Sequence, residues 1–305
     1  MKDVVSGVLL LDKPADISSH SALAKAKFLL KSPTTDSKKA GHTGTLDPMA
    51  TGLLPLCFGE ATKFSQYGLD ADKGYEAIIK LGAASDSGDK DGQITAAADV
   101  PEFDDEILAV VARKLTGAQN QIPPMYSALK KDGKKLYEYA RAGIEVERAP
   151  RPIRIETLTL KKRSADEIAL SVRCSKGTYV RVLGEDVAKQ LGTLGHLTTL
   201  RRTQTGGFSL AQAVSLAQFE AMEFHERMAQ LLPIDVLMAH LPILPVSAQE
   251  AARLRQGQRL NAKDRLANFT FDDAAQAVRL YADDAFVGLG MLEPNGRLQP
   301  KKLVV

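Results

Sequence analysis

The spacing of apolar residues predicts a chain built from both strands and helices. The apolar core Val8–Leu11 is typical of a buried strand, and Tyr75–Leu81 alternates as a half-buried strand does. Ser18 or Ser19 can cap a helix that runs to about Leu30. The same pattern predicts helices at Asp104–Leu115, stopped near Gly117, at Val180–Leu191, ended by Gly192, and over most of Ser215–Leu232. It also predicts paired strands at Arg154–Arg163 and Glu167–Cys174, and a strand at Leu197–Gln204.

Polar stretches and prolines mark the loops and one domain boundary. Lys31–Ala40 and the Asp- and Gly-rich Asp86–Gly92 are expected to be loops, and Leu241–Pro245, with two prolines, is expected to be a linker. The composition changes beyond that point. It predicts a helix at Ala248–Gln256 and strands at Ala277–Ala282 and Ala285–Leu292, with Pro-Asn-Gly forming a hairpin turn. We therefore expect two domains, residues 1–240 and a small β-rich domain at 246–305.

Length and composition are typical of a soluble globular protein. The chain has 305 residues, of which 44% are hydrophobic and 25% charged, enough for one large domain and a smaller one. No apolar run approaches the roughly 20 residues that span a bilayer, and the amino-terminal apolar segment is too short for a signal peptide. Cys57 and Cys174 form no metal-spaced cluster and are expected to be buried thiols. These features predict a cytoplasmic protein with no membrane partner and no metal site.

Positive charge is concentrated in the middle of the chain. The formal net charge is only +3, but residues 120–205 carry 17 Lys and Arg against 9 Asp and Glu, a net of +8. The segments before and after it carry net charges of −4 and −1. A basic segment is often just a solvated face, but an excess of this size indicates a polyanionic partner, and nucleic acid fits best.

The most distinctive stretch is residues 41–62, GHTGTLDPMATGLLPLCFGEAT. Pro48 restricts the backbone of Asp47 to extended geometry, and small neighbours leave the Asp47 carboxylate able to approach a ligand closely. An Asp-Pro pair is also a common helix start, and local chemistry alone favours that alternative. A nucleotide-binding P-loop is excluded because no Gly-Lys-Ser/Thr follows the glycines.

This stretch resembles the signature of the TruB family of pseudouridine synthases, and the resemblance extends over essentially the whole chain. It implies an α+β fold with a mixed, largely antiparallel sheet, flanking helices and a C-terminal PUA-like RNA-binding domain. It also implies that a uridine in the T-loop of tRNA, at the psi-55 position of elongator tRNAs, is converted to pseudouridine without a cofactor. In the family the aspartate of this signature is catalytic, and here it falls on Asp47.

Two further catalytic roles follow from the resemblance. Tyr75 stacks on the target base and is a candidate for the base that removes the C5 proton, and Arg181 pairs with Asp47. An adjacent guanidinium lowers the pKa of a carboxyl group whereas desolvation raises it, so Arg181 is expected to keep Asp47 ionised. Without the resemblance, Tyr75 has the more ordinary role of packing.

Three more residues are assigned by resemblance to substrate binding. Tyr179, in the CSKGTYVR sequence of residues 174–181, lines the uridine pocket, Leu200 closes it, and His42 inserts where the base has been flipped out. Without the resemblance, residues 174–181 are either a phosphate-binding turn or a plain strand-to-helix connection. Leu200 is then a core leucine beside surface arginines, and His42 an unremarkable surface histidine.

RNA contacts are expected mainly in a basic insert at about residues 120–150. The insert mixes lysines with tyrosines, a pattern that suits phosphate contacts and stacking on looped RNA. The resemblance makes it a thumb that folds over tRNA, and a mobile surface loop is the alternative. Lys13, before Pro14, is expected to support the active-site loops. The expected RNA contacts are Lys130, Lys131, Lys134, Lys135, Arg201 and Arg202.

The expected function is therefore that of a cofactor-free isomerase that acts on the tRNA T-stem-loop, as a monomer and without guide RNA. Two alternatives remain open: an RNA-binding or RNA-folding protein whose synthase chemistry is dispensable, and a synthase that depends on a guide RNA. The C-terminal domain has a structural cap as its alternative role. The nucleophilic route, through ribose C1′ or uracil C6, is also open.

Overall fold

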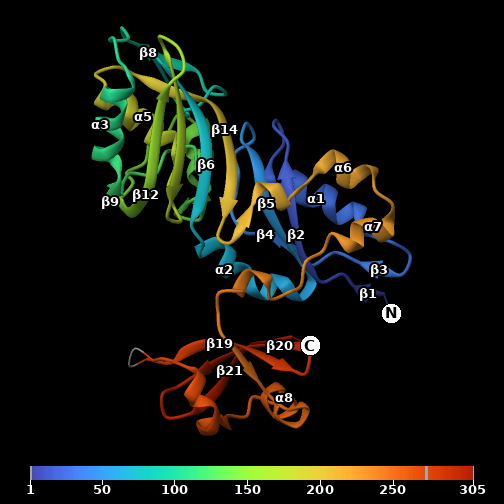
Figure 1. The fold of residues 1–305 in the computed structure, drawn as a ribbon. Helices are drawn as coiled ribbons and strands as arrows, with labels where there is room; N and C mark the ends of the chain where they lie inside the picture. Colours follow the sequence, from blue (N-terminus) through green and yellow to red (C-terminus); the bar gives the residue numbers. More distant parts are fainter. Residues whose placement is uncertain (1, 272–273, 305) are drawn as a thin grey trace.

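A ten-stranded mixed sheet dominates the computed structural model, which describes residues 2–271 and 274–304 (Figure 1). The strand order is β16-β2-β5-β14-β6-β13-β12-β9, with β15 paired to β14 and β4 paired to β5. Among these described strands the β14–β5 and β16–β2 pairs are parallel and the others are antiparallel, which confirms the predicted mixed, largely antiparallel sheet. The bounds are β2 Gly7–Lys13, β4 Ala40–His42, β5 Thr51–Phe58, β6 Lys73–Leu81, β9 Gly117–Gln121, β12 Arg151–Lys162, β13 Glu167–Cys174, β14 Gly195–Thr205, β15 Phe208–Ser209 and β16 Val214–Ser215.

Two helices of this domain begin after capping residues that the sequence offers. Helix α1 (Ser19–Leu29) starts after Ser18, whose hydroxyl accepts from the amide of Ser21, and α3 (Asp105–Leu115) starts after Asp104. Helix α3 packs on β12, and α5 (Val180–Gln190) packs on β14 (Figure 1). Their apolar faces bury the main hydrophobic core. Within the described residues, no helix combines the length and apolar character needed to cross a bilayer.

Three segments differ from the sequence predictions. Lys31–Ala40, expected to be a loop, contains β3 (Thr35–Asp36), which pairs in parallel with β1 (Asp3–Val4). The segment 215–232 is two short helices, α6 (Leu216–Ala221) and α7 (Phe224–Ala229), because Glu223 starts a new capping box after α6. The predicted linker 241–245 contains β17 (Ile243–Pro245), which pairs in parallel with a strand of the C-terminal sheet.

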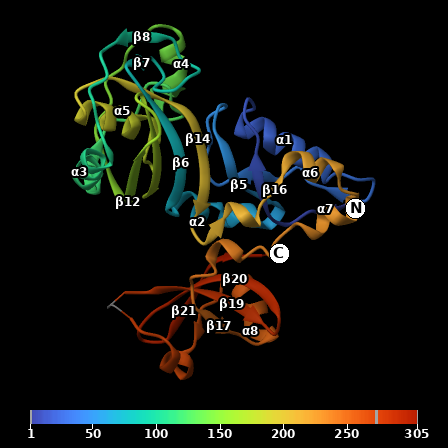
Figure 2. The same cartoon turned by 45° about the horizontal axis from the view of Figure 1, so that its top comes forward.

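The C-terminal residues form a second sheet with its own apolar core. Its strand order is β17-β19-β20-β21-β18. The turn Pro294–Gly296 joins β20 to β21. Strand β21 was not predicted from the sequence. Figure 2 shows this sheet below the first one. It contacts the 3₁₀ helix Gly59–Phe64, which follows β5: the Phe64 and Phe286 rings lie 5.6 Å apart, and the Lys63 ammonium donates to Leu303 O at 2.9 Å. The bounds are β18 Leu260–Asn261, β19 Gln276–Ala282, β20 Ala285–Leu292, β21 Arg297–Leu303 and α8 Ala248–Arg255.

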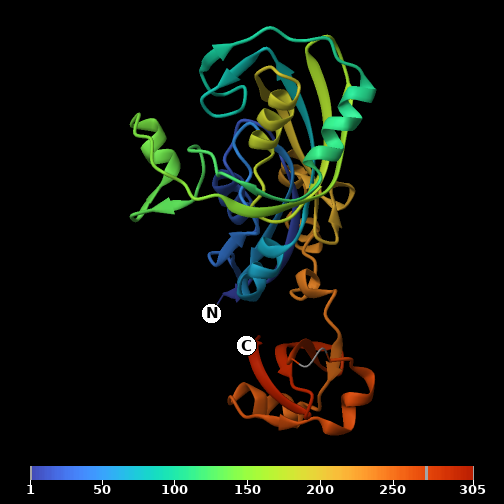
Figure 3. The same ribbon diagram turned by 90° about the vertical axis from the view of Figure 1, so that its left-hand side faces the viewer.

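Residues 122–150 project from the main sheet (Figure 3). Strand β9 belongs to the sheet, so the projecting part begins after Gln121 and rejoins the sheet at β12. It contains the short hairpin β10 (Lys130–Lys131) and β11 (Lys134–Lys135) and the helix α4 (Leu136–Arg141). The remaining elements are α2 Ser65–Asp70, β7 Ala83–Ser85, β8 Ile94–Ala97 and the 3₁₀ helices Leu210–Gln212, Val236–Met238 and Lys263–Asn268.

Candidate active site

The loop that carries Asp47 is held from behind by two buried polar side chains. The Ser19 hydroxyl accepts from the amide of Leu46 at 2.8 Å and donates to its carbonyl at 2.9 Å. The Lys13 ammonium, fully buried, donates to Pro48 O at 3.2 Å as well as to Pro14 O and Ile17 O. Neither helix nor strand starts at Asp47, so the helix-cap alternative is wrong and the predicted supporting role of Lys13 is confirmed.

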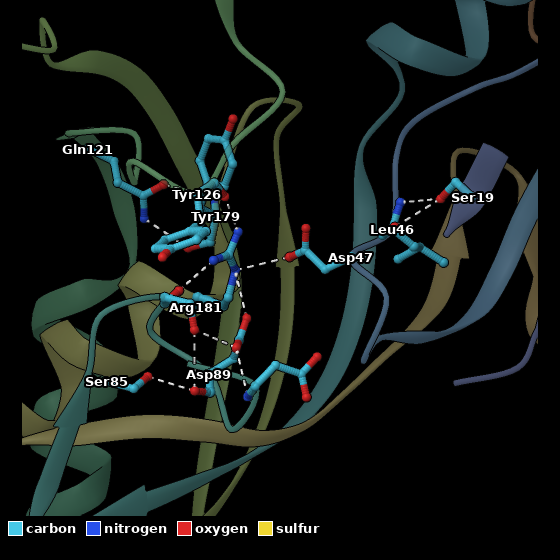
Figure 4. A network of polar contacts seen from close by, with 11 residues as sticks. Ser19, Leu46, Asp47, Ser85, Asp89, Gln121, Tyr126, Tyr179 and Arg181 are labelled. Carbon is cyan, nitrogen blue, oxygen red and sulfur yellow. Dashed lines mark hydrogen bonds and ion pairs between the residues drawn. The ribbon is translucent and has the colours of Figure 1, made fainter. Parts of the chain in front are cut away.

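Arg181 meets Asp47 as predicted. The Arg181 Nε lies 3.0 Å from Asp47 Oδ2, and the two groups face each other in Figure 4. The guanidinium is 3% exposed, donates to Ser87 O through Nη1 and donates to Tyr126 O at 2.7 Å through Nη2. It is therefore fixed on several sides, while the Asp47 side chain remains 36% exposed and reachable by a ligand.

Asp89 is a member of the site that the sequence analysis missed. Its Oδ2 lies 3.6 Å from Arg181 Nε, and its Oδ1 accepts from the Ser87 hydroxyl at 2.6 Å and from the Asp91 amide at 3.1 Å. Residues 86–92 were expected only to form a loop. Three aspartates within these seven residues were the available signal. Arg181 thus lies between two carboxylates, one of them almost fully buried.

Burial determines the direction of the pKa shift at Asp47. The pKa is raised from its usual value, first because the folded chain desolvates the carboxylate, with the Asp89 charge adding to the increase. The Arg181 guanidinium lowers the pKa, as expected from the sequence, but the loss of water outweighs it. The Arg181 contribution therefore has the expected direction, and the ionised state of Asp47 in the working enzyme stays a prediction.

This shift predicts the acidic limb of the pH profile. If the ionised Asp47 is the reactive form, kcat/KM rises with pH through a midpoint above the ordinary aspartate pKa of about 3.9. Because the Asp89 charge raises the Asp47 pKa, Asp89→Asn is expected to move that midpoint to lower pH. Rates of tritium release from C5-labelled tRNA, measured from acidic to neutral pH, test both statements. A wild-type limb at the ordinary aspartate value would contradict them.

Tyr75 and Tyr179 come from different elements, β6 and the residue before α5. Tyr75, on β6, is half-buried, and burial raises the pKa of its hydroxyl, so the phenol is neutral at neutral pH. This favours stacking over the role of a phenolate base. Tyr179 precedes α5, and its backbone is held by Gln121, which accepts from Tyr179 N at 2.8 Å and donates to Tyr179 O at 3.2 Å (Figure 4). Gln121 is a second residue that the sequence analysis did not single out.

Leu200 and His42 belong to the strands around the site. Leu200, 7% exposed, pairs with Ala77 across β14 and β6 and is part of the main core. His42 ends β4, opposite Leu56. Burial and the Arg202 charge lower the pKa of His42, and its Nδ1 is buried without a hydrogen-bond partner among the described residues.

The six basic residues predicted to contact RNA have different environments. Lys130 and Lys134 are exposed on the β10–β11 hairpin, whereas Lys131 donates to Glu147 O at 2.9 Å. Lys135 lies over the Tyr137 ring, 5.4 Å from its centroid. Arg201 is 40% exposed and paired with Asp12 at 2.7 Å.

Arg202 does not lie on the surface. It is 1% exposed, because on β14 its side chain points to the face opposite that of Arg201 and enters the interior. The predicted contact of Arg202 with RNA is therefore wrong.

Comparisons with known proteins cover nearly the whole chain. Residues 32–180 match the model described as "TruB family pseudouridylate synthase (N terminal domain)". Residues 181–239 match "tRNA pseudouridylate synthase B C-terminal domain", and residues 242–304 match "Pseudouridine synthase II TruB, C-terminal". The chain belongs to the TruB family of pseudouridine synthases. The predicted enzyme class, a tRNA pseudouridine synthase and therefore an isomerase, is confirmed by this assignment.

TruB-family relatives match this chain over at least 90% of their own lengths. The protein named tRNA pseudouridine synthase B from Psychrobacter cryohalolentis is 52% identical over 98% of this chain and 94% of its own. The proteins of that name from Aromatoleum aromaticum and Neisseria meningitidis are 52% and 48% identical, over 99% and 94% of this chain and 93% and 90% of their own.

Solved structures also share the TruB-type fold. A structure described as a Cbf5-Nop10-Gar1 complex has a TM-score of 0.68 and 25% identity, over 96% of this chain and 80% of the other. A structure described as an H/ACA RNP bound to a substrate RNA has a TM-score of 0.70 at 23% identity, over 98% and 85% of the two chains. The second likeness supports the fold alone.

Proposed function

We propose that this enzyme converts the psi-55 uridine in the T-loop of elongator tRNAs to pseudouridine, with Asp47 as the nucleophile and without a guide RNA. The observation that carries the proposal is the 3.0 Å pair between Asp47 and the buried Arg181, on a loop braced by Ser19 and Lys13. A part-exposed carboxylate held in one orientation is suited to covalent attack on an extruded nucleoside.

The reaction breaks the N1–C1′ bond of uridine and forms a C5–C1′ bond. Asp47 attacks either ribose C1′, which releases the uracil, or uracil C6, and the uracil rotates while stacked on Tyr75. The bond to Asp47 is then broken, by displacement when C5 bonds to C1′ in the first route or by elimination from C6 in the second, so the carboxylate is regenerated. The C5 proton is then lost and N1 is protonated, so that the product is an isomer of the substrate. In this scheme Arg181 orients Asp47, Tyr179 and Leu200 line the pocket, and His42 occupies the place that the flipped base leaves.

A purified-component assay tests the proposed substrate. The chain alone should convert an unmodified elongator tRNA transcript, and the same transcript with cytidine in place of the target uridine should yield no pseudouridine. Reaction that requires added guide RNA would exclude the stand-alone activity. Mapping pseudouridine in RNA from cells that lack this chain then identifies its targets in the cell.

Relatives support action without a guide RNA. Those with about 50% identity are named tRNA pseudouridine synthase B, whereas the structures described as a Cbf5-Nop10-Gar1 complex and as an H/ACA RNP are more distant. An RNA-folding role without chemistry is the alternative outcome of the assay above. The pair between the buried Arg181 and the part-exposed Asp47 supports the chemical role instead.

We infer that residues 122–150 act as a thumb on the tRNA, and that Lys130 and Lys134 contact phosphates. Each phosphate contact contributes about 0.7–0.9 to the slope of log Kd against log salt, so Lys130→Ala with Lys134→Ala should reduce that slope by about 1.5. Lys25→Ala, at a surface ion pair with Glu220, is the control and should leave the slope unchanged. An unchanged slope in the double variant would contradict contact at these lysines.

The domain organisation remains part of the proposal. We infer a catalytic domain at residues 1–240 and a PUA-like RNA-binding domain at 246–305. The enzyme is proposed to work as a monomer in the cytoplasm.

A further inference from the structure

Arg202 is a buried cation that the mechanism above does not use. Its Nε donates to Leu53 O at 2.7 Å and its Nη2 donates to Gly44 O at 3.1 Å. Of the ion pairs between described residues, none includes Arg202. A guanidinium taken out of water without a carboxylate partner is a cost to folding. Its presence in the core of a catalytic sheet therefore calls for a functional reason.

The strand register places Arg202 against Tyr75. The two residues are direct partners across β14 and β6, so their side chains leave the same face of the sheet. The Arg202 charge acts on the Tyr75 hydroxyl, where it opposes the rise in pKa that burial causes. The ring proposed to stack on the target base therefore lies beside the Arg202 guanidinium.

The same guanidinium fastens the start of the Asp47 loop. Gly44 lies three residues before Asp47 and has a φ of +129°, which favours glycine, and a Cβ there would lie 3.5 Å from Arg202 Nη1. The Arg202 backbone is equally close to β5, because a Cβ at Gly52 would lie 2.3 Å from Arg202 O. Arg202 therefore links the Asp47 loop, β5 and the Tyr75 strand at one point.

Neighbouring charges oppose Arg202. Burial lowers the pKa values of Lys13 and Lys73 to about 8, and repulsion from Arg202 contributes to both decreases. The contacts of Arg202 with Leu53 O and Gly44 O hold the guanidinium in place among these cations.

We propose that Arg202 is a positioning residue for the isomerisation, which holds the Tyr75 ring and the Gly44 end of the Asp47 loop in the arrangement that brings a stacked base to the carboxylate. The inference rests on the functions proposed above for Asp47 and Tyr75. Arg202 is 1% exposed, so its role is to act through Tyr75 and the loop and not by contact with the substrate.

Arg202→Lys tests this role because it keeps the charge and loses the planar fork of donors. Misplacing a reacting group by about 1 Å costs about 100-fold in rate, so we expect the single-turnover rate to fall about 100-fold and the Kd for tRNA to change by less than about 3-fold. Arg227→Lys is the matched control. Arg227 also donates to backbone carbonyls, those of Phe219, Glu220 and Leu29, and its variant should keep the wild-type rate.

A second readout separates positioning from a general loss of stability. With 3-fluorotyrosine at position 75, the wild-type protein and Arg227→Lys should give the same ¹⁹F line, and Arg202→Lys should shift or broaden it. An unchanged line together with a wild-type rate would overturn the proposal. If Arg202→Lys does not fold, Tyr75→Phe removes the other end of the contact. It should then lower the rate with tRNA binding retained, and a wild-type rate would overturn the proposal equally.

Asp47→Asn in the same assays separates this inference from the proposed function. An active Asp47→Asn enzyme would exclude the proposed mechanism. If Asp47→Asn is inactive and Arg202→Lys is fully active, only the positioning role of Arg202 is excluded.

Discussion

Replacement of Asp47 by asparagine is expected to lower the rate of pseudouridine formation by roughly four to six orders of magnitude, as the loss of a covalent nucleophile does elsewhere. Asparagine keeps the shape of the side chain and an oxygen that can accept from Arg181 Nε, but its neutral amide is a poor nucleophile. Binding of tRNA, which depends on surfaces away from this atom, should persist. Tritium release from C5-labelled tRNA measures the rate, and filter binding measures the affinity.

The stability of the same variant provides an independent check. The folded chain raises the pKa of Asp47, so the folded state holds a proton there more strongly than the unfolded state does. Stability from that proton is present at low pH and is lost as pH rises through the raised pKa. At neutral pH the charged carboxylate therefore opposes folding, and Asp47→Asn should melt no lower than the wild type.

A matched control completes this test. Asp99→Asn changes an exposed aspartate outside the Arg181 network and should leave both rate and melting temperature unchanged. Tritium release at the wild-type rate by Asp47→Asn would exclude Asp47 as the nucleophile. A large fall in its melting temperature would instead indicate that Asp47 has a structural role.

Local sequence signals correctly predicted those helices whose first turn is fixed by a nearby capping side chain. Ser18 and Asp104 cap α1 and α3 where expected, because a capping side chain acts within one helical turn. β17 escaped prediction because its pairing partner, β19, lies more than thirty residues further on and its flanking prolines are typical of a linker. Its pairing is a tertiary effect, which no local window contains.

Contacts between site residues that lie far apart in the chain were predicted only through the family resemblance. Nothing in the local sequence of residue 181 indicates a contact with residue 47, and Asp89 joins them only through the fold. Arg202 is a different case. Successive residues of a strand point to opposite faces, so two adjacent arginines could not both face the RNA. The period of the strand predicts that one of them enters the interior, and the structure identifies it as Arg202.

Arg181→Met is expected to lower the single-turnover rate by roughly three orders of magnitude, the upper range for removal of one electrostatic donor from an active site. Three losses combine. Asp47 loses its orienting partner, its pKa rises further because the guanidinium no longer lowers it, and the carbonyls of Ser87 and Tyr126 lose their donor. The residual rate should therefore increase with pH over a range in which the wild-type rate is already constant.

The same substitution should destabilise the fold, because it leaves Asp89 buried without its cation. Removing one partner of a buried ion pair costs about 3–5 kcal/mol in the free energy of unfolding. Adding Asp89→Asn removes the unpaired charge while keeping an oxygen for the Ser87 hydroxyl and the Asp91 amide. The double variant should thus regain much of the stability measured by denaturant unfolding and remain slow, because Asp47 still has no guanidinium beside it. Recovery of the rate together with the stability would mean that Arg181 serves the fold alone.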